Sequence, residues 1–248
     1  MAASLLLLLA ACAGPLSSTA PVVPLLFVDG TACSAVPTSA SRLLTCSHAV
    51  PDVEEGLLLL DDGPHQFRVL RRGAPRSRFE PPEWLSTDPN AASRVPDLAL
   101  DWALLEVDPP LPPDALAGVA LASFDFDGEL PPGSAVTVSG FLPERASDDG
   151  AILERRVDLS SLVFPRTLAG VDPPPSVFAV ASVDRVEADR GGMSGGAVTR
   201  RITDVDWPTN ELEIVGICHG TLVTFVPETN ETLFVGCIVV RPPRDAVR

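Results

Sequence analysis

The chain has 248 residues and a formal net charge of −15, from 33 acidic and 18 basic residues. This acidic balance makes nucleic acid a poor candidate partner, because a nucleic-acid-binding domain needs clustered positive charge. Hydrophobic residues make up 46% of the chain and 26 residues are proline, which excludes a disordered polypeptide and disfavours an all-helical bundle.

Residues 1–20 read as an export leader. The apolar run Leu5 to Ala11 is shorter than the about 20 residues that a spanning helix needs. Its end, Leu9-Ala10-Ala11-Cys12, resembles the lipobox of bacterial lipoproteins, which implies lipidation of Cys12 and contact with a membrane only through that anchor. The alternative is an ordinary signal cleaved near Ala20. Either way we expect an exported protein, in the cell envelope, the periplasm or outside the cell.

From Leu25 onward, short apolar or alternating runs are separated by glycine, proline, aspartate and serine, which predicts an all-β fold of short strands. The candidate strands are Leu43-Leu44, Leu57 to Leu60, Leu98 to Val107, Ala135 to Phe141, Val177 to Val183, Ile214 to Cys218, Leu222 to Val226 and Leu233 to Val240.

Four cysteines remain after Cys12: Cys33, Cys46, Cys218 and Cys237. The simplest pairing joins neighbours in sequence, Cys33 with Cys46 and Cys218 with Cys237, as an oxidising compartment allows. The alternative is four buried thiols. No pair has CxxC spacing, so no zinc knuckle and no other metal site is predicted.

The most linker-like stretch is residues 108–114, where prolines occupy four of the five positions 109–113. Such a segment forms an extended spacer that cannot continue a central strand. It divides the chain into residues 21–113 and 114–248, each long enough for a small barrel.

The segment Gly191 to Val198 has glycines on both sides of Ser194. Such a backbone can approach a substrate closely and turn its N–H groups outward, as an oxyanion hole requires. The segment also fits the G-x-S-x-G nucleophile elbow of α/β-hydrolases, but in that fold the acid and the histidine follow the serine. Only His219 follows Ser194, too near in sequence for that fold.

Upstream of Ser194, Leu43-Leu44-Thr45-Cys46-Ser47-His48 places a histidine after an apolar strand, and Asp101-Trp102-Ala103-Leu104-Leu105 places an aspartate at the head of another. With Gly192-Met193-Ser194-Gly195-Gly196, these segments resemble the three motifs of the trypsin-like (chymotrypsin-fold) serine peptidases, which read L-T-A-A-H, D-x-A-L-L and G-D-S-G-G. The resemblance extends from about Gly30 to Val240.

The resemblance implies two six-stranded antiparallel β-barrels with the active site between them. It implies that Ser194 is the nucleophile, His48 the general base and Asp101 the residue that orients the imidazole, with the N–H groups of Gly192 and Ser194 as the oxyanion hole. Peptide bonds of a protein or peptide substrate would be hydrolysed without a cofactor. The alternative function is a catalytically silent binding lipoprotein of the same fold.

Several residues need separate treatment. Asp97 heads a shorter match to the aspartate motif and is the alternative to Asp101. Met193 replaces the aspartate that pairs with a freed N-terminus in digestive members of the family, so that activation is not expected. His65 follows a polar turn and is expected to be exposed. The resemblance assigns the substrate-binding region to Ala188, His219 and Gly220.

Overall fold

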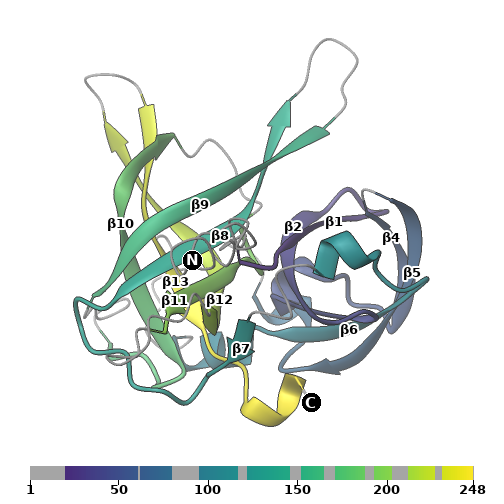
Figure 1. The fold of residues 1–248 in the computed structure, drawn as a ribbon, viewed down its shortest axis with the longest axis horizontal. Coiled ribbons are helices and arrows are strands. Elements are labelled where there is room, and N and C mark those ends of the chain that lie inside the picture. The colour runs from purple at the N-terminus through teal and green to yellow at the C-terminus, as the bar shows by residue number, and fades with distance from the viewer. Residues whose placement is uncertain are drawn as a thin grey trace, which may run out of the picture.

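The computed structural model describes residues 20–60, 62–79, 95–116, 122–145, 152–164, 171–187, 193–202, 212–226 and 231–247. Over these ranges the chain forms two β-barrels that lie side by side, with short 3₁₀ turns between some of the strands (Figure 1). None of the helices in these ranges has the length and apolar character needed to cross a membrane.

The first barrel closes in the strand order β1-β2-β3-β6-β5-β4, with all neighbours antiparallel. Its strands are β1 (Val23–Phe27), β2 (Ala32–Ser39), β3 (Arg42–Thr45), β4 (Glu55–Leu60), β5 (Gly63–Arg72) and β6 (Ala103–Asp108). Side chains alternate in and out along a strand, so His65 and Phe67 of β5 face the core while Gln66 and Arg68 are exposed. The rings of Phe27 and Phe67 meet edge to face inside, with centroids 5.2 Å apart.

The second barrel is formed by six antiparallel strands in the order β11-β8-β9-β10-β13-β12, closed by pairing of β11 with β12. These strands are β8 (Ala135–Arg145), β9 (Ile152–Phe164), β10 (Val177–Glu187), β11 (Ala197–Arg201), β12 (Leu212–Val226) and β13 (Glu231–Val240). The predicted double barrel of two six-stranded antiparallel sheets is therefore confirmed. A further short strand, β7 (Ala122–Phe124), pairs parallel with β12 and was not predicted.

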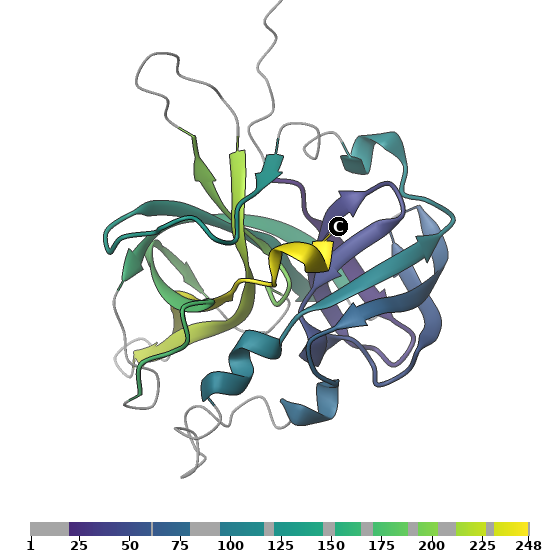
Figure 2. The ribbon, with the colours of Figure 1, turned by 90° about the horizontal axis from the view of Figure 1, so that it is seen from below.

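The apolar core of the first barrel extends into the second. Leu25, Leu43 and Leu105 of the first barrel belong to the same buried cluster as Ile214 and Ile217 of β12. The C-terminal turn η6 (Arg244–Val247) also reaches this cluster through Ala246, and Figure 2 shows it lying against the first barrel. The barrels are thus fixed to each other by packing as well as by the chain that links them.

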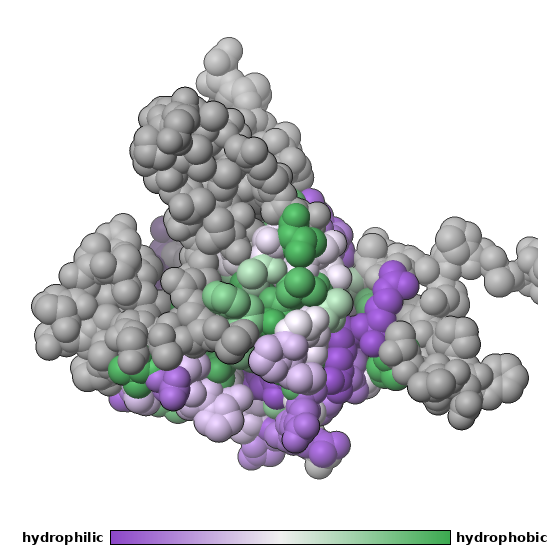
Figure 3. All heavy atoms as spheres, turned by 90° about the vertical axis from the view of Figure 1, so that its left-hand side faces the viewer, coloured by the Kyte–Doolittle hydropathy of each residue, from purple (hydrophilic) through white to green (hydrophobic). Residues whose placement is uncertain are grey.

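The side of the second barrel seen in Figure 3 has both hydrophilic and apolar side chains on its described surface. The exposed large apolar side chains of this barrel include Leu162, Phe164, Val171 and Val183. Apolar atoms contribute more than half of the accessible surface of ordinary folded proteins, so these side chains alone do not indicate an interface.

Two strand predictions need correction. Residues Val95–Leu100 form the 3₁₀ turn η3, so only the second half of the predicted strand Leu98 to Val107 is a strand. Pro96 cannot donate to a sheet ladder, and the Asp101 N–H instead bonds the Leu98 carbonyl at 3.0 Å. The two strands predicted within 214–226 are one strand, β12, interrupted by bulges.

His65 is buried, not exposed as the polar turn before it predicted. His65 is only 1% accessible because it occupies an inward position of β5. Nδ1 lies 2.6 Å from the carbonyl oxygen of Pro109 in the proline-rich linker, and Nε2 lies 2.9 Å from Asp62 Oδ1. His65 therefore connects the wall of the first barrel to the start of the linker.

The two short-range disulfides are not formed. Cys33, Cys46, Cys218 and Cys237 are all buried thiols, as the alternative predicted. The Cys46 thiol donates to the carbonyl oxygen of Cys218 at 3.0 Å, and Cys33 Sγ lies 3.6 Å from Thr45 Oγ1. The Cys46 contact joins the first barrel to the second.

Candidate active site

The histidine and the aspartate come from neighbouring segments of the first barrel. β3 ends at Thr45, and His48 follows in the 3₁₀ turn η1 (Ser47–Ala49). Asp101 lies between η3 and β6. Because Thr45 pairs with Ala103 in the β3–β6 ladder, the two segments reach the same end of the barrel.

Ser194 belongs to the second barrel, in a tight turn just before β11. The Gly196 N–H bonds the Met193 carbonyl at 2.8 Å, which closes the turn around Ser194. The Gly195 N–H bonds the Cys218 carbonyl at 2.7 Å, and the Ser194 carbonyl accepts the Ser34 N–H at 2.8 Å. The turn is thus held by β12 on one side and by β2 of the first barrel on the other.

Gly195 is the position where this turn requires glycine. Its φ is +82°, which is the left-handed region. A Cβ there would stand 2.0 Å from the Ser34 carbonyl oxygen and 2.2 Å from Thr45 Oγ1. The missing side chain lets the Ser194 turn touch the first barrel directly.

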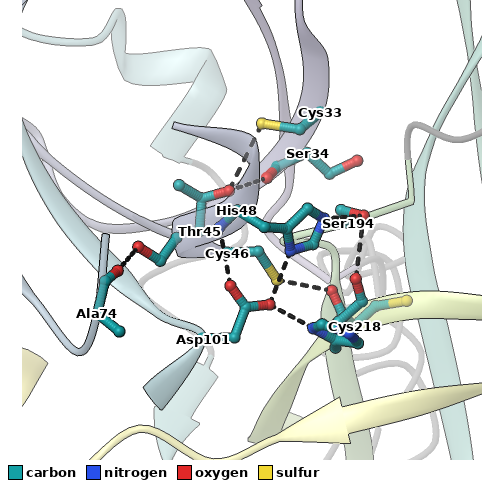
Figure 4. A network of polar contacts seen from close by, with 11 residues as sticks. Cys33, Ser34, Thr45, Cys46, His48, Ala74, Asp101, Ser194 and Cys218 are labelled. Carbon is teal, nitrogen blue, oxygen red and sulfur yellow. Dashed lines mark hydrogen bonds and ion pairs between the residues drawn. The ribbon is translucent and has the colours of Figure 1, made fainter. Parts of the chain in front are cut away.

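The three side chains form one hydrogen-bonded chain across the junction of the barrels (Figure 4). Ser194 Oγ lies 3.0 Å from His48 Nε2, and His48 Nδ1 lies 2.8 Å from Asp101 Oδ2. The other carboxylate oxygen, Oδ1, accepts the His48 backbone N–H at 2.8 Å. In this order a hydroxyl, an imidazole and a carboxylate can pass a proton from Ser194 to His48 while Asp101 holds the ring.

The Ser194 hydroxyl has two acceptors within reach. Besides His48 Nε2, the carbonyl oxygen of His219 lies 3.1 Å away. One hydroxyl has one proton, so it donates to His48 when that nitrogen is unprotonated. When His48 is an imidazolium, Nε2 donates to Ser194 Oγ and the hydroxyl proton turns to His219.

Asp101 is fully buried yet ionised. Its side chain has no accessible surface, and burial alone would raise the pKa of its carboxyl. The charges of His48 and His219 and the hydrogen bonds from both rings act in the opposite direction, so that the pKa lies well below its ordinary value. The carboxylate therefore stays an acceptor throughout the neutral pH range.

Asp97, the alternative to Asp101, points elsewhere. Its Oδ1 accepts a hydrogen bond from Arg78 Nη2 at 2.7 Å, on the outside of the molecule. The structure brings Asp101, and not Asp97, against His48.

Cys46, His48 and Asp101 offer ligand atoms within 4.8 Å of one another, which is a spacing that a metal ion could use. A cysteine binds a metal as thiolate. Burial raises the pKa of the Cys46 thiol, and the charge of Asp101 raises it further. Since the thiol also donates to Cys218, these groups fit a hydrogen-bonded set better than a metal centre.

Met193 lies in the apolar core of the second barrel. It is 1% accessible and packs with Val138, Val198 and Val215. The residue before Ser194 is thus an apolar side chain that needs no ion pair.

The structure describes only some of the other site residues that the sequence predicts. Cys12, Ala188 and Gly192 lie outside the described residues. Gly220 lies on β12 beside His219, whose ring turns inward to Asp101. The contact of His219 with Asp101 was not foreseen, because no sequence pattern shows that β12 bulges at this point.

The chain matches no protein-family model and no curated protein. Among solved structures it is similar to the inactive form of the Rv3671c protease, at 18% identity and a TM-score of 0.44, over 89% of this chain and 86% of that one. A second similar structure is the inactive form of a serine-to-alanine mutant of Rv3671c from M. tuberculosis H37Rv, at 18% identity, a TM-score of 0.43 and coverage of 89% and 83%. The arrangement of Ser194, His48 and Asp101 is therefore what indicates a function.

Proposed function

We propose that the protein is a serine endopeptidase that hydrolyses peptide bonds through an acyl-enzyme. The observation that carries the proposal is the continuous hydrogen-bonded chain from Ser194 through His48 to the buried Asp101. A buried carboxylate behind an imidazole that faces a hydroxyl is costly to build. Its use is to make the hydroxyl a nucleophile.

In the first step, Ser194 Oγ forms a bond to the acyl carbon of the scissile peptide while His48 Nε2 accepts the hydroxyl proton. The same proton then moves to the leaving nitrogen as the C–N bond breaks. Water attacks the resulting ester in the second step, again with His48 as base, and Ser194 regains its proton. Asp101 keeps the proton of His48 on Nδ1 and stabilises the imidazolium at each stage.

The remaining assignments complete the proposal. The N–H groups of Gly192 and Ser194 would bind the oxyanion, and Ala188, His219 and Gly220 would border the bound peptide, with the backbone of β12 pairing with it as an added strand. The export leader of residues 1–20, lipidation at Cys12 and the division at residue 113 belong to the same proposal. So does a protein or peptide as substrate, with no cofactor.

A fluorophosphonate probe tests the function directly, because it forms a covalent adduct with an activated serine. We expect labelling of the wild type at Ser194, loss of labelling in Ser194→Ala, and a rate at least about 1,000-fold lower in His48→Ala. Asp97→Asn is the matched control for Asp101→Asn: the first should label like the wild type and the second at least about 100-fold more slowly. Equal labelling of wild type and Ser194→Ala overturns the proposal.

A further inference from the structure

We propose that His219 is a positioning residue, a second histidine that fixes Asp101 and Ser194 for the reaction. This inference rests on the proposed function and assigns a role that the serine, histidine and aspartate motifs do not contain. It follows from the two contacts that His219 makes, one through its ring and one through its backbone.

The ring of His219 contacts the same carboxylate oxygen that His48 uses. His219 Nδ1 and Asp101 Oδ2 are hydrogen-bonded, and the Asp101 side chain is wholly inaccessible while that of His219 is 10% accessible. The rings of His48 and His219 meet edge to face with centroids 5.1 Å apart. Asp101 thus lies between one histidine from each barrel.

The local shape of β12 explains why the ring points inward. In the pairing with β13, Cys218 lies opposite Val239 and Gly220 lies opposite Ile238, so His219 is the extra residue of a β-bulge. A bulge turns a side chain away from the direction that regular alternation would give it. Here it directs the His219 ring across the junction toward the first barrel.

The hydrogen bonds at Asp101 determine which nitrogen of the His219 ring carries a proton. Asp101 is ionised, so it can only accept, and both imidazole nitrogens at Oδ2 must carry protons. His219 therefore holds its proton on Nδ1. Together with the His48 backbone N–H at Oδ1, the carboxylate accepts three donors, which leaves it one orientation.

The backbone of His219 acts at the other end of the same chain. Its carbonyl oxygen is the second acceptor of the Ser194 hydroxyl, at 3.1 Å. One residue therefore contacts the group that orients His48 and also the nucleophile that His48 activates. A shift of His219 would displace both ends relative to His48.

Two substitutions of His219 distinguish the loss of its hydrogen-bond donor from the loss of its side-chain volume. Asn places an N–H donor at the same distance along the side chain as Nδ1, whereas Leu has a similar size and no donor. For fluorophosphonate labelling of Ser194, and for kcat on any peptide that the enzyme cleaves, we expect His219→Leu to be about 10- to 100-fold slower and His219→Asn to stay within about 5-fold of the wild type. The labelling rate is the deciding measurement, because the proposed function also places His219 beside the bound peptide and KM for a peptide therefore reports both roles.

A matched control is His65→Asn, which removes another buried histidine with two ring hydrogen bonds, here in the wall of the first barrel. We expect it to lower the unfolding temperature without slowing the labelling of Ser194. Equal rates for wild type and His219→Leu overturn the proposal. An equal loss in folded His219→Asn and His219→Leu also overturns it, because donation would then not be what matters.

Proton NMR of protein with ¹⁵N-labelled histidine reads the contact without any activity. We expect ring N–H protons far downfield for both His48 and His219, with the His219 proton absent in His219→Asn and the His48 proton retained. If the wild type shows no His219 proton of this kind, the contact and the inference are both wrong. If the proton is present but Ser194 is never labelled, the proposed function fails and the inferred role in catalysis fails with it.

Discussion

At the scale of single residues, Gly195 decides whether the Ser194 turn can meet the first barrel. We expect Gly195→Ala to abolish labelling of Ser194 and to destabilise the fold by about 3 kcal/mol or more, because its Cβ would overlap the Ser34 carbonyl as well as strain the backbone. The control is Gly133→Ala, with φ +86° and no atom within 4 Å of its Cβ, where only the strain of about 1–2 kcal/mol applies. Thermal unfolding and labelling of both variants check this, and two equal losses would contradict it.

The lowered pKa of Asp101 makes a second prediction at this scale. In the unfolded chain the carboxyl takes up a proton near its ordinary pKa of about 4, but in the folded protein it stays ionised to lower pH. Its contribution to stability is therefore complete above about pH 5 and is lost progressively as the pH falls below 4. The Asp101→Asn variant has no carboxyl at this position, so this part of the acid-dependent decrease in stability is absent from it.

Urea unfolding between pH 6 and 3 measures this effect. We expect the free energy of unfolding of the wild type to fall more steeply with acid than that of Asp101→Asn, by up to about 1.4 kcal/mol per pH unit for one proton. Asp97→Asn is the control, since its carboxylate lies on the surface against Arg78. Parallel curves for wild type and Asp101→Asn would contradict the prediction.

Residues of the site differ in how far the sequence reveals them. His48, Asp101 and Ser194 stand in short motifs, and the structure brings these three side chains together. The inward ring of His219 depends on a bulge, and the burial of His65 depends on the register of β5 with its neighbours. Neither the bulge nor the register is encoded within a few residues of the histidine concerned, so local patterns miss both.

At the scale of elements, four buried thiols lie on neighbouring segments and are shielded from solvent. We expect iodoacetamide to modify Cys33, Cys46, Cys218 and Cys237 quickly in guanidinium without reductant, and very slowly in the native protein. Peptide mass spectrometry of the non-reduced protein checks this. Detection of a linked pair, such as Cys218 with Cys237, would contradict it.

The strands show which patterns are informative. Leucine- and valine-rich runs such as those in β3, β4 and β8 are visible because their residues alternate or are continuously apolar. β9 is missed because its first half, Ile-Leu-Glu-Arg-Arg, is rich in charge. Only pairing with the distal end of β8 makes that segment a strand, and pairing between separate segments is not a local property.

At the scale of the whole molecule, the shared core predicts that both barrels unfold together. The buried cluster that holds Leu43 and Leu105 also holds Ile217 of the second barrel. Calorimetry should show one unfolding transition. Ile217→Ala should lower the temperature of that single transition, with a loss of about 2–5 kcal/mol in the free energy of unfolding. Val183→Ala, at a residue 62% accessible, is the control and should change little. Two separate transitions would contradict the prediction.

The candidate site combines residues of both barrels, so the order in which the chain is synthesised determines when the site can form. His48 and Ser194 are 146 residues apart in the chain, and the Ser194 turn is anchored by the later strand β12 through Cys218. A nascent chain that has emerged only as far as β6 contains His48 and Asp101 but not Ser194. The hydrogen-bonded chain cannot assemble until β12 has followed, so the Ser194 hydroxyl meets the His48 ring only after strands of both barrels have been made.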